Sequence, residues 1–264
     1  MYLSVNHAKI YCSDTGARRG PVVVLLHPFP LSHEIWKNQI ELLSQDYRVL
    51  APDYRGLGRS EVGDGQYSID LMAEDFIGVL DTLGVEKAIW CAASMGGYVA
   101  LSAYEKSNDR CSGLILCNTK SGSDTEAIRQ RRVQSIRDIK KMGLSEFAEG
   151  FLKSAFTEKS LQENSPQIQM ARDLIKKNSV LGICGVQMAL GLRRDLTDLL
   201  SSISVPTLVI SGDEDKVIVS SESKLLSEKI NRADFVMVPK SAHFSFLENS
   251  SFFNQNLLSF LKKI

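Results

Sequence analysis

The fold of this chain is decided by the stretch Ile89-Trp90-Cys91-Ala92-Ala93-Ser94-Met95-Gly96-Gly97-Tyr98. Its first half is wholly apolar, which is typical of a strand that is covered on both faces of a sheet. Ser94 comes next, and Gly96 and Gly97 follow where a helical pattern begins. The predicted strand therefore runs directly into a turn of small residues and then into a helix. One reading of Ser94 is that it only caps this helix.

Similar apolar runs, bounded by turn residues, recur along the chain. They predict strands at Val22–Leu26, Tyr47–Ala51, Ala88–Ala93, Gly113–Cys117, Thr207–Ser211 and Phe235–Val238. Helical patterns lie between them, and the clearest begins after the N-cap residue Ser68 and stops at Gly84. Because strand and helix alternate, the sequence predicts an α/β fold in which helices flank a mostly parallel, twisted sheet.

This alternation breaks between about residues 121 and 199, where no strand-like run occurs. Helical patterns follow one another there, at Asp124–Met142, Leu144–Phe156, Pro166–Asn178 and Val180–Arg193. We therefore expect an α/β core formed by residues 1–120 and 200–264 and a helical cap formed by residues 121–199. Ligands of open α/β sheets bind beyond the carboxyl ends of the strands, so an insertion at that edge can roof the site.

Composition and charge exclude several classes of function. The chain has 264 residues, of which 44% are hydrophobic and 23% charged, as in an ordinary globular protein with a large core. Lys and Arg number 31, as do Asp and Glu, which argues against nucleic acid or an acidic membrane surface as a partner. The start of the chain lacks a signal-peptide pattern, and no stretch approaches the ~18 apolar residues of a membrane-spanning helix. We expect a cytoplasmic protein.

The cysteines and histidines do not predict a metal site. The five cysteines show no C-x-x-C spacing and mostly lie beside apolar residues, which predicts buried free thiols. They are Cys12, Cys91, Cys111, Cys117 and Cys184. The four histidines offer no H-E-x-x-H or comparable local pair. We therefore expect no bound metal.

The turn around Ser94 resembles the nucleophile elbow of the α/β-hydrolase superfamily, which is usually written G-x-S-x-G. Gly96 fits this motif, whereas Ala92 stands where the family usually has Gly, a departure of one methyl group. The resemblance extends from about Val22 to Phe260. It implies the α/β-hydrolase fold and a serine hydrolase in which Ser94 is the nucleophile.

A serine hydroxyl is a weak nucleophile, so it needs a base within hydrogen-bond reach and a third group that orients the base. In this superfamily the acid and then the histidine follow the serine, each after a later strand. Gly212-Asp213-Glu214-Asp215 resembles the family's G-x-x-D turn and places Asp215 in the acid position, with Asp213 as the alternative. His243, after the last predicted strand, is the candidate base.

Acyl transfer also needs hydrogen-bond donors for the oxyanion of the tetrahedral intermediate. The resemblance implies that one donor is the backbone N–H of Met95. Leu26-His27-Pro28-Phe29-Pro30 resembles the family's H-G-x-P turn, which nominates the N–H of Phe29 as the other donor. Pro28 replaces the usual Gly there, and it stiffens the turn without removing the donor of Phe29. His27 is interpreted as a residue that organises this loop.

The segment from Asp53 to Ser60 resembles a D-x-R-G-x-G-x-S loop of the same superfamily. Its glycines also suggest phosphate binding, but no G-K-S/T follows and no G-x-G-x-x-G opens a helix. We interpret the segment as structural, with Asp53 as the partner of Arg55.

Within the superfamily, the chain is most similar to 3-oxoadipate enol-lactonases and small-molecule carboxylesterases, and Leu114–Thr119 follows the enol-lactonase pattern. The substrate implied is a small ester or lactone, with no cofactor. A substrate carboxylate calls for a cation, and the cap has candidates in Arg129, Arg131, Arg132, Arg193 and Arg194. Candidates for an acyl pocket are Phe147, Phe151, Phe156 and Met188, although their helical spacing favours packing onto the core.

Other functions use the same residues and stay open at this point. Cofactor-free haloperoxidases and C–C bond hydrolases retain the serine, and a ligand-binding protein can retain the whole scaffold. Haloalkane dehalogenases and epoxide hydrolases resemble the chain less, because they have an aspartate where Ser94 stands. The sequence does not determine the oligomeric state.

Overall fold

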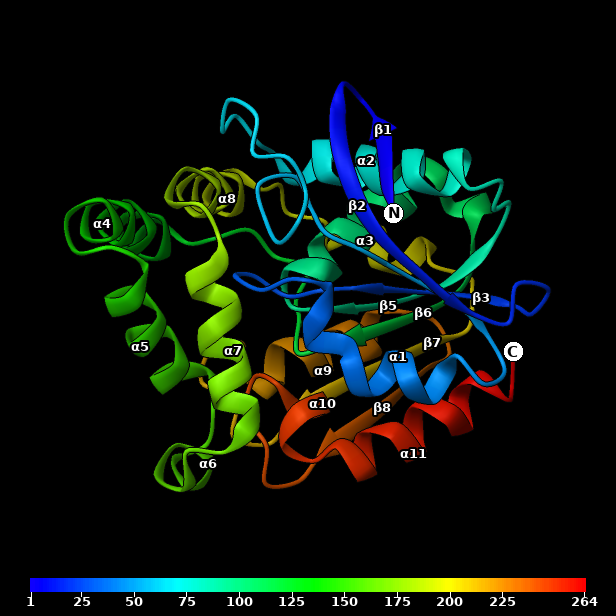
Figure 1. Cartoon of the computed structure of the whole chain (residues 1–264). Helices are drawn as coiled ribbons and strands as arrows, with labels where there is room; N and C mark the ends of the chain where they lie inside the picture. Colours follow the sequence, from blue (N-terminus) through cyan, green and yellow to red (C-terminus); the bar gives the residue numbers. More distant parts are fainter.

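The structure is a computed structural model that describes all 264 residues. Its centre is an eight-stranded sheet in the order β1-β2-β4-β3-β5-β6-β7-β8 (Figure 1). The strands are β1 (Tyr2–Val5), β2 (Ala8–Gly16), β3 (Val22–Leu26), β4 (Arg48–Pro52), β5 (Ala88–Ala93), β6 (Cys111–Cys117), β7 (Thr207–Gly212) and β8 (Ala233–Val238). β2 pairs antiparallel with β1 and β4, and all the other strand pairs are parallel. The predicted α/β class with a mostly parallel sheet is confirmed.

The six predicted strands correspond to β3–β8 with bounds that differ by at most two residues. Sequence analysis did not predict β1 and β2. Side chains of β1 are alternately exposed and buried, because only one face of this strand is covered. Such an edge strand lacks the continuous apolar run that marks a doubly covered strand.

Helices cover both faces of the sheet. In Figure 1, α2 (Ile69–Thr82) and α3 (Met95–Ser107) lie on one side, and α1 (Lys37–Leu43) and α11 (Ser250–Leu261) on the other. Alternate residues of β3 supply the two hydrophobic cores: Val24 and Leu26 pack in one, and Val23 and Leu25 in the other. The other elements before β6 and after the helices that follow it are η1 (His33–Trp36), η2 (Asn108–Arg110), η3 (Asp198–Ser202), α9 (Ser220–Lys229) and α10 (Ser245–Glu248).

Successive helices fill the interval between β6 and β7, and they lie together at one end of the sheet (Figure 1). They are α4 (Glu126–Met142), α5 (Leu144–Ala155), α6 (Glu158–Glu163), α7 (Pro166–Lys177) and α8 (Val180–Leu192). Four of them match predicted patterns. Sequence analysis missed α6, whose six residues include none that is buried, so it has no apolar face to detect.

No helix of the structure combines the length and the apolar character that crossing a membrane requires. All five cysteines are buried and none forms a disulfide, as predicted.

Candidate active site

Ser94 lies in a strained turn between β5 and α3. Its backbone has φ +49° and ψ −113°, which residues with a side chain rarely adopt. A Cβ atom at Gly96 would lie 2.3 Å from the carbonyl oxygen of Leu26, and one at Gly97 would lie 2.4 Å from Oγ1 of Thr119. Thr119 also donates a 2.7 Å hydrogen bond to the Ser94 carbonyl. Because α3 lies this close to β3 and to Thr119, only glycine fits at positions 96 and 97 without a shift of the neighbouring atoms.

The side chain of Ser94 is directed at an imidazole. Ser94 stands at the N-cap position of α3, but its hydroxyl makes no capping hydrogen bond, so the helix-cap alternative is wrong. Its Oγ lies 2.9 Å from Nε2 of His243, and Nδ1 of the same ring lies 2.9 Å from Oδ2 of Asp215. When Nδ1–H donates to the carboxylate, Nε2 is left to accept the proton of the hydroxyl.

The carboxylate of Asp215 is buried and fully hydrogen-bonded. Its Oδ1 accepts from the N–H groups of Val217 (2.8 Å) and Ile218 (3.0 Å), and its Oδ2 accepts from Nδ2 of Asn118 (2.9 Å) as well as from His243. Burial alone would raise the pKa of Asp215, but the charge and hydrogen bond of His243 and the other donors hold that pKa below its usual value. The group is therefore an anion at neutral pH.

Asp213, the alternative acid, lies outside this chain of hydrogen bonds. It is exposed, and its Oδ1 accepts from the backbone N–H of Ser241 at 3.1 Å. Of the two candidate acids, only Asp215 bonds to His243.

Sequence analysis missed the part played by Asn118. Its Nδ2 donates to Asp215 and to the carbonyl of Ala242 (3.2 Å), and its Oδ1 accepts from the hydroxyl of Ser245 (2.7 Å). The signal was present, because Asn118 is the first residue after β6 and the carboxyl ends of parallel strands meet at one edge of the sheet. The same rule explains why Ser94, Asp215 and His243, each from a loop after its own strand, come together.

The two residues that carry the candidate oxyanion donors line the same cavity. Met95 is the first residue of α3, where an N–H group has no partner within the helix. Phe29 lies in the loop after β3, and its backbone N–H donates to no other backbone group. Both residues, with Ser94 and His243, line one cavity.

His27 does not act on Ser94 but organises the neighbouring loops, as interpreted from the sequence. The ring is completely buried, with Nδ1 3.1 Å from the Pro28 carbonyl and Nε2 accepting from the N–H of Tyr54 at 3.4 Å. Burial lowers the pKa of His27 to about 4, despite the opposing charge of Asp53. His27 is therefore neutral at pH 7.

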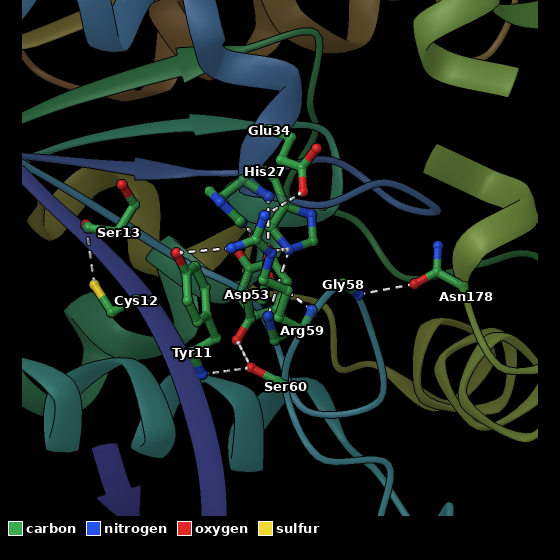
Figure 2. A network of polar contacts seen from close by, with 12 residues as sticks. Tyr11, Cys12, Ser13, His27, Glu34, Asp53, Gly58, Arg59, Ser60 and Asn178 are labelled. Atoms are coloured by element: carbon green, nitrogen blue, oxygen red, sulfur yellow. Dashed lines mark hydrogen bonds and ion pairs between the residues drawn. The ribbon is translucent and has the colours of Figure 1, made fainter. Parts of the chain in front are cut away.

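Asp53 is the centre of the polar network in Figure 2. Its carboxylate accepts from the backbone N–H of His33 (2.7 Å), from Nδ1 of the same ring (2.9 Å) and from the N–H of Arg59 (2.9 Å). The segment from Asp53 to Ser60 thus has a structural role, as interpreted from the sequence. The predicted Asp53–Arg55 pair is wrong. Arg55 instead contacts Asp75 on α2, with Nη2 2.7 Å from Oδ1, because the loop directs its side chain toward that helix.

The cavity that contains Ser94 has a volume of about 640 Å³. Its apolar lining includes Phe29, Phe147 and Phe151, and its charged lining includes Lys120, Arg131 and Arg132 together with Asp124, Asp138 and Glu146. The other predicted aromatic and apolar candidates lie elsewhere: Phe156 is buried in the core, and Met188 is exposed to solvent. The cavity is thus large enough for a small organic molecule and offers both apolar and cationic contacts.

Asp124 is the centre of an ionic cluster that borders the cavity. Asp124 pairs with Arg132 (Nε–Oδ2 2.5 Å) and with the buried Arg193 (Nη1–Oδ1 2.6 Å), whose guanidinium also lies 4.2 Å from the ring centre of Tyr98. Arg129, Arg193 and Arg194 do not line the cavity, since their side chains are engaged elsewhere; Arg194, for example, pairs with Asp70 and Glu105. Two arginines thus face one aspartate within this cluster, while Asp138 and Glu146 add acidic groups to the lining of the same cavity.

These features define a class of protein. A mostly parallel eight-stranded sheet, with a serine in a strand-to-helix turn at its carboxyl edge, is the architecture of the α/β hydrolases. Residues 21–250 match the model of the family described as "alpha/beta hydrolase fold", and the chain belongs to that family.

Relatives that match over more than nine tenths of the chain include enol-lactonases, esterases and a protein named "Putative non-heme chloroperoxidase". The chain is 27% identical to "3-oxoadipate enol-lactonase 1" of Acinetobacter baylyi over 94% of its own length and 91% of the relative's. A thermophilic esterase from Thermogutta terrifontis, solved with malate bound, has a TM-score of 0.93 and 31% identity, with 100% of this chain and 98% of that chain covered. The enol-lactonase from Burkholderia xenovorans LB400 has a TM-score of 0.93 and 28% identity, with coverage of 99% and 100%.

Proposed function

We propose that this protein is a serine hydrolase that cleaves a small carboxylic ester or lactone through an acyl-enzyme intermediate. The single observation that carries the proposal is the chain of hydrogen bonds from Ser94 through His243 to Asp215, 2.9 Å at each step, at the wall of a cavity of about 640 Å³. A hydroxyl activated in this way, beside donors that are not otherwise engaged, has the parts that acyl transfer needs.

In the proposed first step, Oγ of Ser94 attacks the carbonyl carbon while Nε2 of His243 takes the hydroxyl proton. The carbonyl oxygen gains the negative charge and is held by the N–H groups of Phe29 and Met95. His243 then protonates the leaving alkoxide, and the C–O bond of the ester breaks. A water molecule, deprotonated by His243, attacks the acyl-enzyme, so that the carboxylic acid leaves and Ser94 is restored. No cofactor is required.

We propose further that residues 121–199 form a cap over the site. Support comes from the lining of the cavity, to which α4, α5 and α8 contribute residues such as Ile128, Phe147 and Leu190. A substrate that carries a carboxylate, as the names of the enol-lactonase relatives suggest, would lie with that group near Lys120, Arg131 and Arg132.

The test of the proposed function uses Ser94→Ala with a short p-nitrophenyl ester and a fluorophosphonate probe. We expect kcat to fall on the order of 10⁶-fold, because the nucleophile is removed, and labelling to disappear. Ser154→Ala is the matched control, since Ser154 also lines the cavity but its hydroxyl donates to the Phe151 carbonyl. A Ser94→Ala protein that keeps more than a tenth of the parent rate would refute the assignment.

The same probe separates the alternatives. A ligand-binding protein with an idle hydroxyl would stay unlabelled, while its melting temperature would rise with a bound ligand. A haloperoxidase or a C–C bond hydrolase would be labelled, but it would turn over its own substrates faster than esters and lactones in a panel.

A further inference from the structure

Asn178 lies outside the proposed catalytic groups but holds two loops of the site. It is buried between α7 and α8, and all its side-chain hydrogen-bonding atoms are engaged. Its Oδ1 accepts from the backbone N–H of Gly58 at 2.8 Å, a contact drawn in Figure 2, and its Nδ2 donates to the carbonyls of Pro30 (3.0 Å) and Leu174 (2.9 Å). One side chain therefore joins the end of α7 to two separate loops.

The first of these loops, residues 28–31, has few hydrogen bonds of its own. Pro28 and Pro30 have no N–H group, so neither can donate a hydrogen bond that would fix the turn. The only backbone hydrogen bond within residues 28–31 is the 3.1 Å contact from the N–H of Leu31 to the Pro28 carbonyl. The two prolines restrict the backbone torsions of this loop, but the hydrogen bonds that fix its place relative to the rest of the chain come from outside residues 28–31.

Asp53 and Asn178 supply such hydrogen bonds at two different residues, one just after the loop and one within it. Asp53 fixes the far end of the loop through the N–H of His33 (2.7 Å), and Asn178 fixes the Pro30 carbonyl, one residue from Phe29. The Gly58 turn that Asn178 also holds packs tightly on Asp53, since a Cβ atom at Gly58 would lie 2.4 Å from that carboxylate. The loop with the candidate oxyanion donor is thus fastened to both the sheet and the end of α7.

We infer that Asn178 is a positioning residue for the oxyanion donor of Phe29 and that it acts through Pro30. This inference rests on the proposed hydrolase function, because the donor matters only if a tetrahedral oxyanion forms. Loss of the side chain releases the Pro30 carbonyl, and the N–H of Phe29 then spends less time where the oxyanion develops. The effect falls on the transition state more than on the bound substrate.

The kinetic test compares Asn178→Ala with Ser179→Ala. Ser179 is the adjacent residue and caps α8 by accepting from the N–H of Gly182, and its side chain makes no hydrogen bond to either loop. We expect Asn178→Ala to lower kcat for a p-nitrophenyl ester about 10- to 100-fold with KM within a factor of about two. Binding of phenylboronic acid, which forms a tetrahedral adduct with an activated serine, should weaken in the same proportion. Ser179→Ala should change neither.

Asn178→Asp is the second variant and applies if Asn178→Ala does not fold. It keeps an oxygen for the Gly58 N–H but removes the donor to Pro30, so we expect the same loss of kcat. If either folded variant has a kcat within twofold of the parent, or if kcat falls while phenylboronic acid binds as before, the inference is wrong.

Hydrogen exchange makes this inference distinguishable from the proposed function. The N–H of Leu31, which donates to the Pro28 carbonyl, should exchange faster in Asn178→Ala than in the parent, whereas Ser179→Ala should leave it unchanged. If the parent is not labelled by fluorophosphonate, the proposed function fails, but the exchange measurement still tests whether Asn178 holds the loop. Unchanged exchange of the Leu31 N–H would overturn the inference whatever the activity.

Discussion

Asn118 donates a 2.9 Å hydrogen bond to Oδ2 of Asp215, the same oxygen that accepts from the imidazole of His243. Asn118 also holds the carbonyl of Ala242, the residue before that histidine. A single amide therefore fixes the carboxylate and the loop of the proposed base relative to each other, and its donation helps to keep the pKa of Asp215 low.

Replacement of Asn118 should impair both activity and stability. Asn118 has φ +48°, so Asn118→Gly removes the side chain without straining the backbone. We expect kcat to fall on the order of tenfold and the free energy of unfolding to fall by about 2 kcal/mol, because buried partners lose their donor and acceptor. Ester hydrolysis and urea unfolding measure these two quantities.

Asn164→Gly is the matched control, since Asn164 also has a positive φ (+43°) but ends α6 far along the chain from the proposed catalytic groups. It should leave kcat unchanged. Equal losses of kcat in both variants would contradict a specific role for Asn118.

The two candidate acids give a direct comparison. Asp215→Asn should lower kcat on the order of 10⁴-fold, because the amide cannot hold His243 in the tautomer that accepts the serine proton. Asp213→Asn should leave kcat within about twofold, since Asp213 is exposed and bonds only to the backbone of Ser241. Steady-state hydrolysis of one ester by both proteins decides between them, and the opposite ranking would move the acid role to Asp213.

The sequence predicted those features that depend on order along the chain. Ser94, Asp215 and His243 each follow an apolar run, and in a parallel sheet the ends of such runs share an edge. The same rule predicts that Asn118, which follows β6, lies at this edge. It does not predict the contacts of Asn178 with Pro30 and Gly58, because they span more than a hundred residues and depend on side-chain direction. For the same reason the partner of Arg55 was mispredicted, since no pattern pointed to Asp75 on α2.

Gly96 should tolerate no side chain. A Cβ atom there would lie 2.3 Å from the backbone oxygen of Leu26, which cannot rotate away as a side chain would. We expect Gly96→Ala to lower the free energy of unfolding by about 3 kcal/mol or more. Gly150→Ala, in the middle of α5 with nothing within 4 Å of the added Cβ, should instead raise it slightly. Urea unfolding of the two variants tests the contrast, and similar values for both would show that the elbow accommodates a methyl group.

Lys120 should select for substrates that carry a carboxylate. It lines the cavity, lies directly after Thr119 and takes part in no ion pair of the structure. Methyl hydrogen succinate and methyl butyrate share a four-carbon acyl skeleton, which ends in a carboxylate in the first and in a methyl group in the second. We expect Lys120→Met to raise KM for the succinate ester about 10-fold or more, since a hydrogen bond to a charged group is lost, and to leave KM for the butyrate ester unchanged. An equal effect on both esters would indicate lost packing instead of lost charge recognition.

His27 should make folding stability depend on pH in a defined direction. Its pKa is about 4 in the folded chain, because of burial, and 6.5 when exposed. Between these values the unfolded chain binds more protons than the folded chain, so the free energy of unfolding rises with pH across this window and falls as the pH drops from 6.5 toward 4. The loss from this group alone should reach about 2 kcal/mol at pH 5.

Urea unfolding at pH 7.5 and pH 5 measures this dependence. His27→Gln should be less stable than the parent at pH 7.5, because the bonds to Pro28 and Tyr54 change, but its difference between the two pH values should be smaller by about 2 kcal/mol. His7→Asn is the control, since His7 is exposed and Asn tolerates its positive φ of +62°. If His27→Gln retains the full pH difference of the parent, the proton that destabilises the fold in acid binds at another residue.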